Sequence, residues 1–95
     1  MSLNFLVELQ DLIDTRKKEM PEGSYTTKLF NKGINTIAQK VGDEAVELII
    51  EAKDKNDILF LNEAADLTYH LLVLLTEKGY RIEDVEKILK ERHKK

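Results

Sequence analysis

The chain has 95 residues, with 15 lysines and arginines against 18 aspartates and glutamates, a formal net charge of −3, and no cysteine. This length accommodates one domain, taken as residues 1–95, and the lack of cysteine excludes a disulfide framework. No basic stretch suggests a nucleic-acid partner, and neither a signal peptide nor an apolar run of membrane-spanning length is evident, so we expect a cytoplasmic protein with no membrane partner.

The first part of the chain combines one amphipathic helix with a connection. Apolar residues recur at helical spacing from Phe5 onward and the pattern stops at Pro21, which predicts a helix over about residues 3–20. Residues 24–30 carry capping hydroxyls and are interpreted as a connection with about one helical turn, closed by Gly33.

The remaining two thirds of the chain is predicted to form three helices. Long helices are expected over residues 34–53 and 58–78, joined by a polar turn at 54–57 and ended by Gly79. A last helix is expected over residues 82–93, with acids in its first turn and bases in its last, as the helix dipole favours. The fold class is therefore all-α. Two long antiparallel helices with shorter flanking helices make a four-helix-bundle-like architecture.

Each long helix is apolar around most of its circumference and carries one narrow polar wedge. A helix of this kind is normally buried, so side chains in the wedge are expected to point into a cleft of the bundle. At 100° per residue, the wedge of the first long helix holds Lys40, Glu44, Glu47 and Glu51, and that of the second holds Glu63, Asp66 and His70.

Antiparallel packing would bring two pairs of acids to the same level: Glu44 and Glu47 on one helix, Glu63 and Asp66 on the other. Four close negative charges repel strongly in a low-dielectric cleft, and divalent cations relieve this repulsion. Oxygen ligands without cysteine favour Mg²⁺, or Mn²⁺, over zinc, and Mg²⁺ commonly bridges carboxylates to phosphates. The alternative is a solvated charged face without a metal, which single Glu-x-x-Glu pairs most often are.

Three separate blocks, in order, resemble the phosphoribosyl-ATP pyrophosphatase family, within the wider all-α nucleoside triphosphate pyrophosphatase superfamily. The likeness extends from about Leu9 to Arg92. Asp43 departs from the pattern, because the family more usually has glutamate there. No cyclohydrolase domain, which some relatives carry, is expected in this chain. The three blocks are Ser24-Tyr25-Thr26-Thr27-Lys28-Leu29, residues 39–47 and residues 63–75.

The resemblance implies hydrolysis of phosphoribosyl-ATP to phosphoribosyl-AMP and pyrophosphate, the second step of histidine biosynthesis. It implies Mg²⁺ held by the four acids, with Glu44 or Glu47 as the catalytic group that orients or deprotonates the attacking water. Substrate contacts are expected from Lys28, Lys40, Thr27 and His70, and more weakly from Tyr25. For each of these an ordinary role stays open: an ion pair with Glu44 for Lys40, a helix cap for the segment of Thr27 and Lys28, a hydrogen bond to a carboxylate for His70, and core packing for Tyr25.

Small size also bears on assembly. A chain of this length buries about 60–65% of its unfolded surface, so sharing a helical face with a second copy is favourable and we expect a homodimer. Two rival functions remain: a house-cleaning pyrophosphatase acting on free nucleoside triphosphates, and a non-enzymatic helical interaction module in which the acids form only a charged groove.

Overall fold

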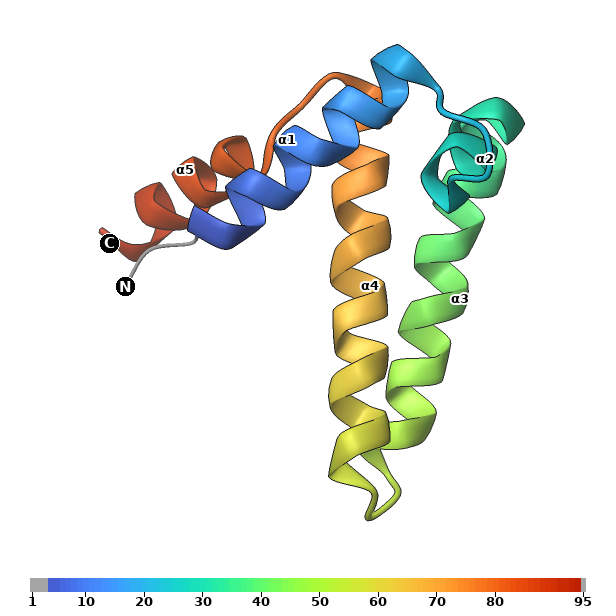
Figure 1. Cartoon of the computed structure of the whole chain (residues 1–95). Coiled ribbons are helices and arrows are strands. Elements are labelled where there is room, and N and C mark those ends of the chain that lie inside the picture. Colours follow the sequence, from blue (N-terminus) through green and yellow to red (C-terminus); the bar gives the residue numbers. More distant parts are fainter. Residues whose placement is uncertain (1–3, 95) are drawn as a thin grey trace.

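A computed structural model of the chain describes residues 4–94, and in this range the secondary structure is entirely helical (Figure 1). The all-α expectation is confirmed, and the expected long helices and last helix agree with the structure to within one residue at either end. Residue 3, where the first helix was expected to begin, lies outside the described residues. The helices are α1 (Asn4–Glu19), α2 (Tyr25–Lys32), α3 (Ile34–Ala52), α4 (Asp57–Lys78) and α5 (Ile82–His93).

The interpretation of residues 24–30 as a connection is wrong, because α2 is a helix of eight residues. The Ser24 Oγ atom accepts a hydrogen bond from the Thr27 amide at 3.2 Å, which caps the first turn. The helix continues until Gly33, whose φ of 91° ends it while its amide donates to the Leu29 carbonyl at 3.1 Å. The segment expected to contain about one helical turn is thus a helix capped at both ends.

Helices α3 and α4 form a long antiparallel hairpin, hereafter the arm, which projects from the rest of the molecule (Figure 1). Asn56 caps the start of α4 through a 3.1 Å hydrogen bond from the Leu59 amide to its Oδ1 atom. Gly79 ends α4 in the left-handed conformation, with φ 85° and ψ 22°, which a residue with a side chain rarely adopts. The expected antiparallel pairing is confirmed.

The other helices gather at one end of the arm. Helix α1 crosses the C-terminal end of α4, α5 lies alongside α1, and α2 contacts both α1 and the start of α3 (Figure 1). The buried apolar residues lie at this junction: Ile13, Leu29, Ile37, Leu72 and Val73.

A buried glutamine fastens α1 to the turn between α4 and α5. The Nε2 atom of Gln10 donates to Thr76 Oγ1 at 3.0 Å and to the Tyr80 carbonyl at 2.9 Å, and its Oε1 accepts from the Ile82 amide at 2.7 Å. Nearby, Arg81 pairs with Asp14 at 2.6 Å. The crossing of α1 over α4 is therefore held by directional polar contacts as well as by apolar packing.

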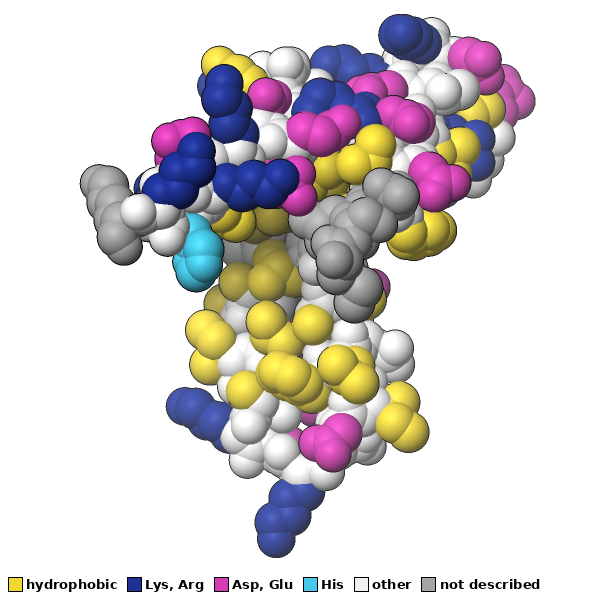
Figure 2. Space-filling model, turned by 90° about the vertical axis from the view of Figure 1, so that its left-hand side faces the viewer, with side chains coloured by type: hydrophobic (Ala, Val, Ile, Leu, Met, Phe, Trp, Pro, Cys, Tyr) yellow, Lys and Arg dark blue, Asp and Glu magenta, His cyan; other side chains and the backbone are white. Residues whose placement is uncertain are grey.

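Much of the arm is uncovered within one chain. Ile37 is the single buried residue on α3, so the expectation that both long helices are buried is not met by one chain in its described part. Figure 2 shows hydrophobic side chains gathered over the surface of the arm. Along the arm one chain supplies two of the helices that a four-helix bundle requires. The exposed large apolar residues of the arm are Ile34, Val46, Ile49, Ile50, Ile58, Leu59 and Leu61.

Helix α4 corrects one expectation from the sequence, since by length and composition alone it is apolar enough to cross a membrane. One such helix is weak evidence of a span, because the core helix of a water-soluble bundle passes the same test. Glu63 and Asp66 lie in its middle and meet a carboxylate of α3, an arrangement that a hydrocarbon environment strongly disfavours. We therefore interpret α4 as a helix that packs against other helices, as it does here against α3 and α1.

Candidate carboxylate site

The arm brings acids from α3 and α4 together midway along its length. One carboxylate oxygen from each of Glu44, Glu63 and Asp66 lies within 4.8 Å of the other two. Glu44 and Glu63 are half-buried, whereas Asp66 is exposed. Helical geometry explains the meeting, since Glu63 and Asp66 are one turn apart and face the neighbouring helix at the level of Glu44.

Glu47, the fourth predicted ligand, is exposed and stands outside this close group, but it contributes to the same electrostatic field. The pKa of Glu63 is raised above its ordinary value, first by partial burial and then by neighbouring negative charges. In decreasing order these charges belong to Glu44, Asp66, Glu47 and Glu51. The charges of all the other predicted ligands therefore act on Glu63. Glu51, a residue of the wedge that was not predicted as a ligand, acts on it too.

Two oxygens of the cluster test whether it suits a cation. Glu44 Oε2 and Glu63 Oε2 are shielded from solvent and receive no hydrogen bond from any described residue. A buried carboxylate oxygen without a partner is costly, and a bound cation would supply the missing interaction. The donors are all carboxylates, which suits a hard divalent ion. The residues present therefore fit a metal ion.

The predicted substrate-binding residues lie on three different helices. Lys40 is half-buried on α3 one turn before Glu44, and no ion pair between described residues involves it. Lys28 is exposed on α2. Thr27 is 7% exposed, and its Oγ1 atom has no hydrogen-bond partner among the described residues. The ion pair between Lys40 and Glu44, which was the alternative for this lysine, is absent here.

His70 lies on α4 one turn beyond Asp66, and both of its ring nitrogens have partners inside the chain. Nδ1 lies 2.7 Å from the Asp66 carbonyl oxygen, and Nε2 lies 2.8 Å from the Tyr25 hydroxyl. Beside them, the hydroxyls of Thr26 and Tyr69 are hydrogen-bonded to each other. These links between α2 and α4 were not predicted from the sequence. The hydrogen-bonding side chains belong to two pairs of adjacent residues, Tyr25-Thr26 and Tyr69-His70. No local spacing rule relates residues that lie more than 40 positions apart.

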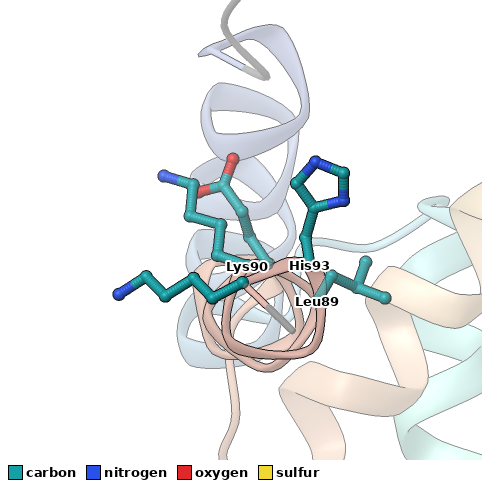
Figure 3. A pocket seen from close by; sticks show the side chains of 5 residues that line it. Leu89, Lys90 and His93 are labelled. Carbon is teal, nitrogen blue, oxygen red and sulfur yellow. The ribbon is translucent and has the colours of Figure 1, made fainter.

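A hollow in the surface lies elsewhere, on α5, as an open depression of about 670 Å³. Figure 3 shows Leu89, Lys90 and His93 projecting from this helix in different directions. The depression contains none of the predicted site residues, and an open surface of this kind provides little desolvation. The carboxylates, which carry the unsatisfied oxygens, remain the candidate site.

Comparison with known proteins gives a consistent result. The family model described as phosphoribosyl-ATP pyrophosphohydrolase matches residues 6–93. A histidine biosynthesis bifunctional protein HisIE from Bacteroides thetaiotaomicron is 62% identical to the chain and covers 94% of it, although the match spans only 44% of that protein. A phosphoribosyl-ATP pyrophosphatase from Leptospira biflexa is 46% identical, over 96% of this chain and 99% of that protein. A phosphoribosyl-ATP pyrophosphatase from Clostridium acetobutylicum is 48% identical, over 95% of this chain and 82% of that protein.

Proposed function

The chain belongs to the phosphoribosyl-ATP pyrophosphohydrolase family, and from this premise we propose that it hydrolyses phosphoribosyl-ATP to phosphoribosyl-AMP and pyrophosphate. This is a step of histidine biosynthesis. The observation that carries the proposal is the convergence of three carboxylates from two helices, two of them with buried oxygens that lack a partner. The chain spans less than half of the bifunctional relative, so the proposal concerns only the matched activity. We treat residues 1–95 as one domain with this activity.

Mg²⁺ is the cation that we propose for the cluster, with Mn²⁺ as a substitute, held by Glu44, Glu47, Glu63 and Asp66. When bound, Mg²⁺ supplies positive charge that neutralises the triphosphate and promotes ionisation of the attacking water. The oxygen-only donor set supports this choice. Glu47 is assigned to the set because its charge acts on Glu63, although its carboxylate lies outside the close group.

Within the chain, the catalytic work falls to Glu44 and Glu47. Glu44 belongs to the close group, so its carboxylate lies where the proposed cation would bind. Glu47 lies one turn further along α3 and is exposed, which leaves its carboxylate available to orient or deprotonate water at the α-phosphorus. Lys40, Lys28 and Thr27 are proposed to contact phosphate oxygens, because neither lysine takes part in an ion pair between described residues and the buried Thr27 hydroxyl lacks a partner among them.

Pyrophosphate release is the measurement that tests this function. Release from phosphoribosyl-ATP should require Mg²⁺, stop on addition of chelator, and exceed release from ATP or dUTP. Glu47→Gln should lower kcat at least about 100-fold with an unchanged circular dichroism spectrum. Preference for another triphosphate would assign the chain to the house-cleaning branch, and no release from any triphosphate would favour the interaction module.

A homodimer is the assembly that we propose, and its interface is the uncovered apolar surface of the arm. Exposed isoleucines and leucines lie on both α3 and α4, and 17% of the apolar stretch of α4 is buried within one chain. Two arms packed together would supply the four helices of a bundle and bury these residues.

We further propose that the protein works in the cytoplasm without a membrane or nucleic-acid partner. Its relatives include enzymes named for phosphoribosyl-ATP, which is a small charged metabolite. The chain carries more acids than bases, which opposes binding to phosphate backbones.

A further inference from the structure

His70 joins two parts of the site that come from different helices. It is 6% exposed, and its ring meets those of Tyr25 and Tyr69 edge-on, with centroids 5.8 and 5.9 Å away. Tyr25 is the first residue of α2, and Asp66 is a member of the close carboxylate group on α4. The imidazole therefore lies between the segment that carries Thr27 and Lys28 and the turn that carries a proposed metal ligand.

The direction of the two hydrogen bonds follows from the chemistry of their ends. The Asp66 carbonyl oxygen can only accept, so Nδ1 of His70 carries the hydrogen in the 2.7 Å contact. In the neutral ring Nε2 is then an acceptor, and the Tyr25 hydroxyl donates to it across 2.8 Å. Both ring nitrogens are occupied, so a substrate contact by His70 would require breaking one of these bonds.

We propose that Tyr25 and His70 are positioning residues, which hold the first turn of α2 against the carboxylate cluster through the chain from the Tyr25 hydroxyl to His70 and the Asp66 carbonyl. This inference deepens the proposed function and rests on it for its kinetic test. In this role the Tyr25 hydroxyl makes the hydrogen bond to His70, and the ring only places the hydroxyl within reach of it. The bond between Thr26 and Tyr69 fastens the same turn a second time, so loss of the Tyr25 hydroxyl loosens α2 without detaching it.

The test compares Tyr25→Phe with a matched control, Tyr80→Phe, which removes a hydroxyl from a tyrosine that is 56% exposed. Tyr25→Phe should lower kcat/KM for phosphoribosyl-ATP about 10- to 100-fold, mainly through KM, because the phosphate-contacting segment is displaced. Its affinity for Mn²⁺, measured by electron paramagnetic resonance, should stay within about twofold of wild type, since none of the proposed carboxylate ligands is changed. Tyr80→Phe should match wild type in both measurements.

A second variant separates positioning from direct contact with substrate. In His70→Asn the side-chain amide can still donate to the Asp66 carbonyl, but it cannot reach the Tyr25 hydroxyl. Its kcat/KM should fall as far as that of Tyr25→Phe, and the double variant should show no further loss beyond about twofold, because both changes break one chain. Additive losses would overturn the inference, as would a matching loss of Mn²⁺ affinity in Tyr25→Phe.

Ring stacking on the substrate is the competing role for Tyr25, and Tyr25→Leu distinguishes it. Stacking predicts full activity in Tyr25→Phe and loss only in Tyr25→Leu, a result that would overturn the positioning role. Hydrogen exchange provides a readout without substrate: amides of α2 should exchange faster in Tyr25→Phe than in Tyr80→Phe. If wild type hydrolyses no phosphoribosyl-ATP, the proposed function fails, and unchanged exchange in α2 would overturn the inference separately.

Discussion

At the scale of single residues, Glu63 shows the electrostatic repulsion among the acids of the site. Its carboxylate is half-buried among other acids, and its pKa is raised by that burial and by the neighbouring charges. A raised pKa means that the folded chain holds the proton more tightly than the unfolded chain does. Below the ordinary value of 4.5 the group is protonated in both states, and its contribution to stability is lost as the pH rises through the folded-state pKa. Near neutral pH the charge on Glu63 therefore lowers the stability of the folded chain when no cation is bound.

Replacing Glu63 by Gln should therefore have opposite effects with and without metal. In chelator the variant should melt at a higher temperature than wild type, because one repelling charge is gone, and the difference should shrink as the pH falls from about 7 toward 4.5. With Mg²⁺ the wild type should gain stability and the variant should gain less. Thermal melts followed by circular dichroism at several pH values provide the measurement.

Glu22→Gln is the control for that experiment, since Glu22 is an exposed acid in the turn after α1, outside the carboxylate cluster. It should melt like wild type in chelator across the same pH range. A Glu63→Gln protein that is less stable than wild type in chelator would contradict the proposed repulsion, and equal Mg²⁺ stabilisation of both proteins would remove Glu63 from the metal set.

At the scale of helices, the relation between α1 and α4 depends on a polar contact that no helical pattern indicates. Gln10 lies on the face of α1 that an amphipathic reading assigns to the core, and it is 0% exposed. Its side-chain amide satisfies the Tyr80 carbonyl and the Ile82 amide in the turn before α5. Because this turn leaves α4 at Gly79, Gln10 links α1 to the segment through which α5 returns alongside α1.

Gln10→Ala should destabilise the protein by about 2–4 kcal/mol, because two partly buried backbone groups lose their partners and a cavity replaces the buried side chain. Urea unfolding, with the midpoint and slope compared with wild type, measures the loss. Gln39→Ala changes an exposed glutamine on α3 and should alter stability by no more than about 0.5 kcal/mol. Equal effects of the two substitutions would show that the contacts of Gln10 contribute no specific stability.

At the scale of the whole molecule, the arm is the feature that one chain leaves incomplete. The buried core lies where α1 and α2 meet the arm, while the far half of the arm exposes apolar residues on both helices (Figures 1 and 2). Exposed apolar surface of this extent is typical of an interface. The carboxylates lie on the same two helices, so in the proposed homodimer the packing of two arms would also remove water from the site.

Ile50→Glu should therefore raise the dissociation constant of the proposed homodimer at least about 100-fold, since a charge would be buried without a partner. Ile50 is 54% exposed in one chain, and Leu12 on α1 is 46% exposed outside the arm, so Leu12→Glu is the matched control. Sedimentation velocity at several concentrations measures both. A monomeric wild type, or an Ile50→Glu protein that assembles normally, would contradict this interface.

Local rules in the sequence determined most of the secondary structure and the identity of the acidic pairs. Apolar periodicity and terminal residues such as Gly79 depend on neighbours within a few positions, so the bounds of α3, α4 and α5 could be read directly. The meeting of Glu44 with Glu63 and Asp66 followed because a short turn leaves antiparallel packing as the simplest arrangement. Helix α2 was taken for a connection, although its capping residues were recognised, because eight residues are too few to show a clear apolar periodicity.

Only the tertiary structure decided how far each acid lies from the others and what holds α2 in place. Glu47 falls outside the close group although its spacing matches that of its neighbours, because helix rotation sets the distances between side chains on two helices. The bond between Tyr25 and His70 joins residues 45 positions apart, which no periodicity records. The uncovered arm likewise emerged only in three dimensions, because an apolar pattern specifies that a surface will be buried but not whether the same chain or another chain will cover it.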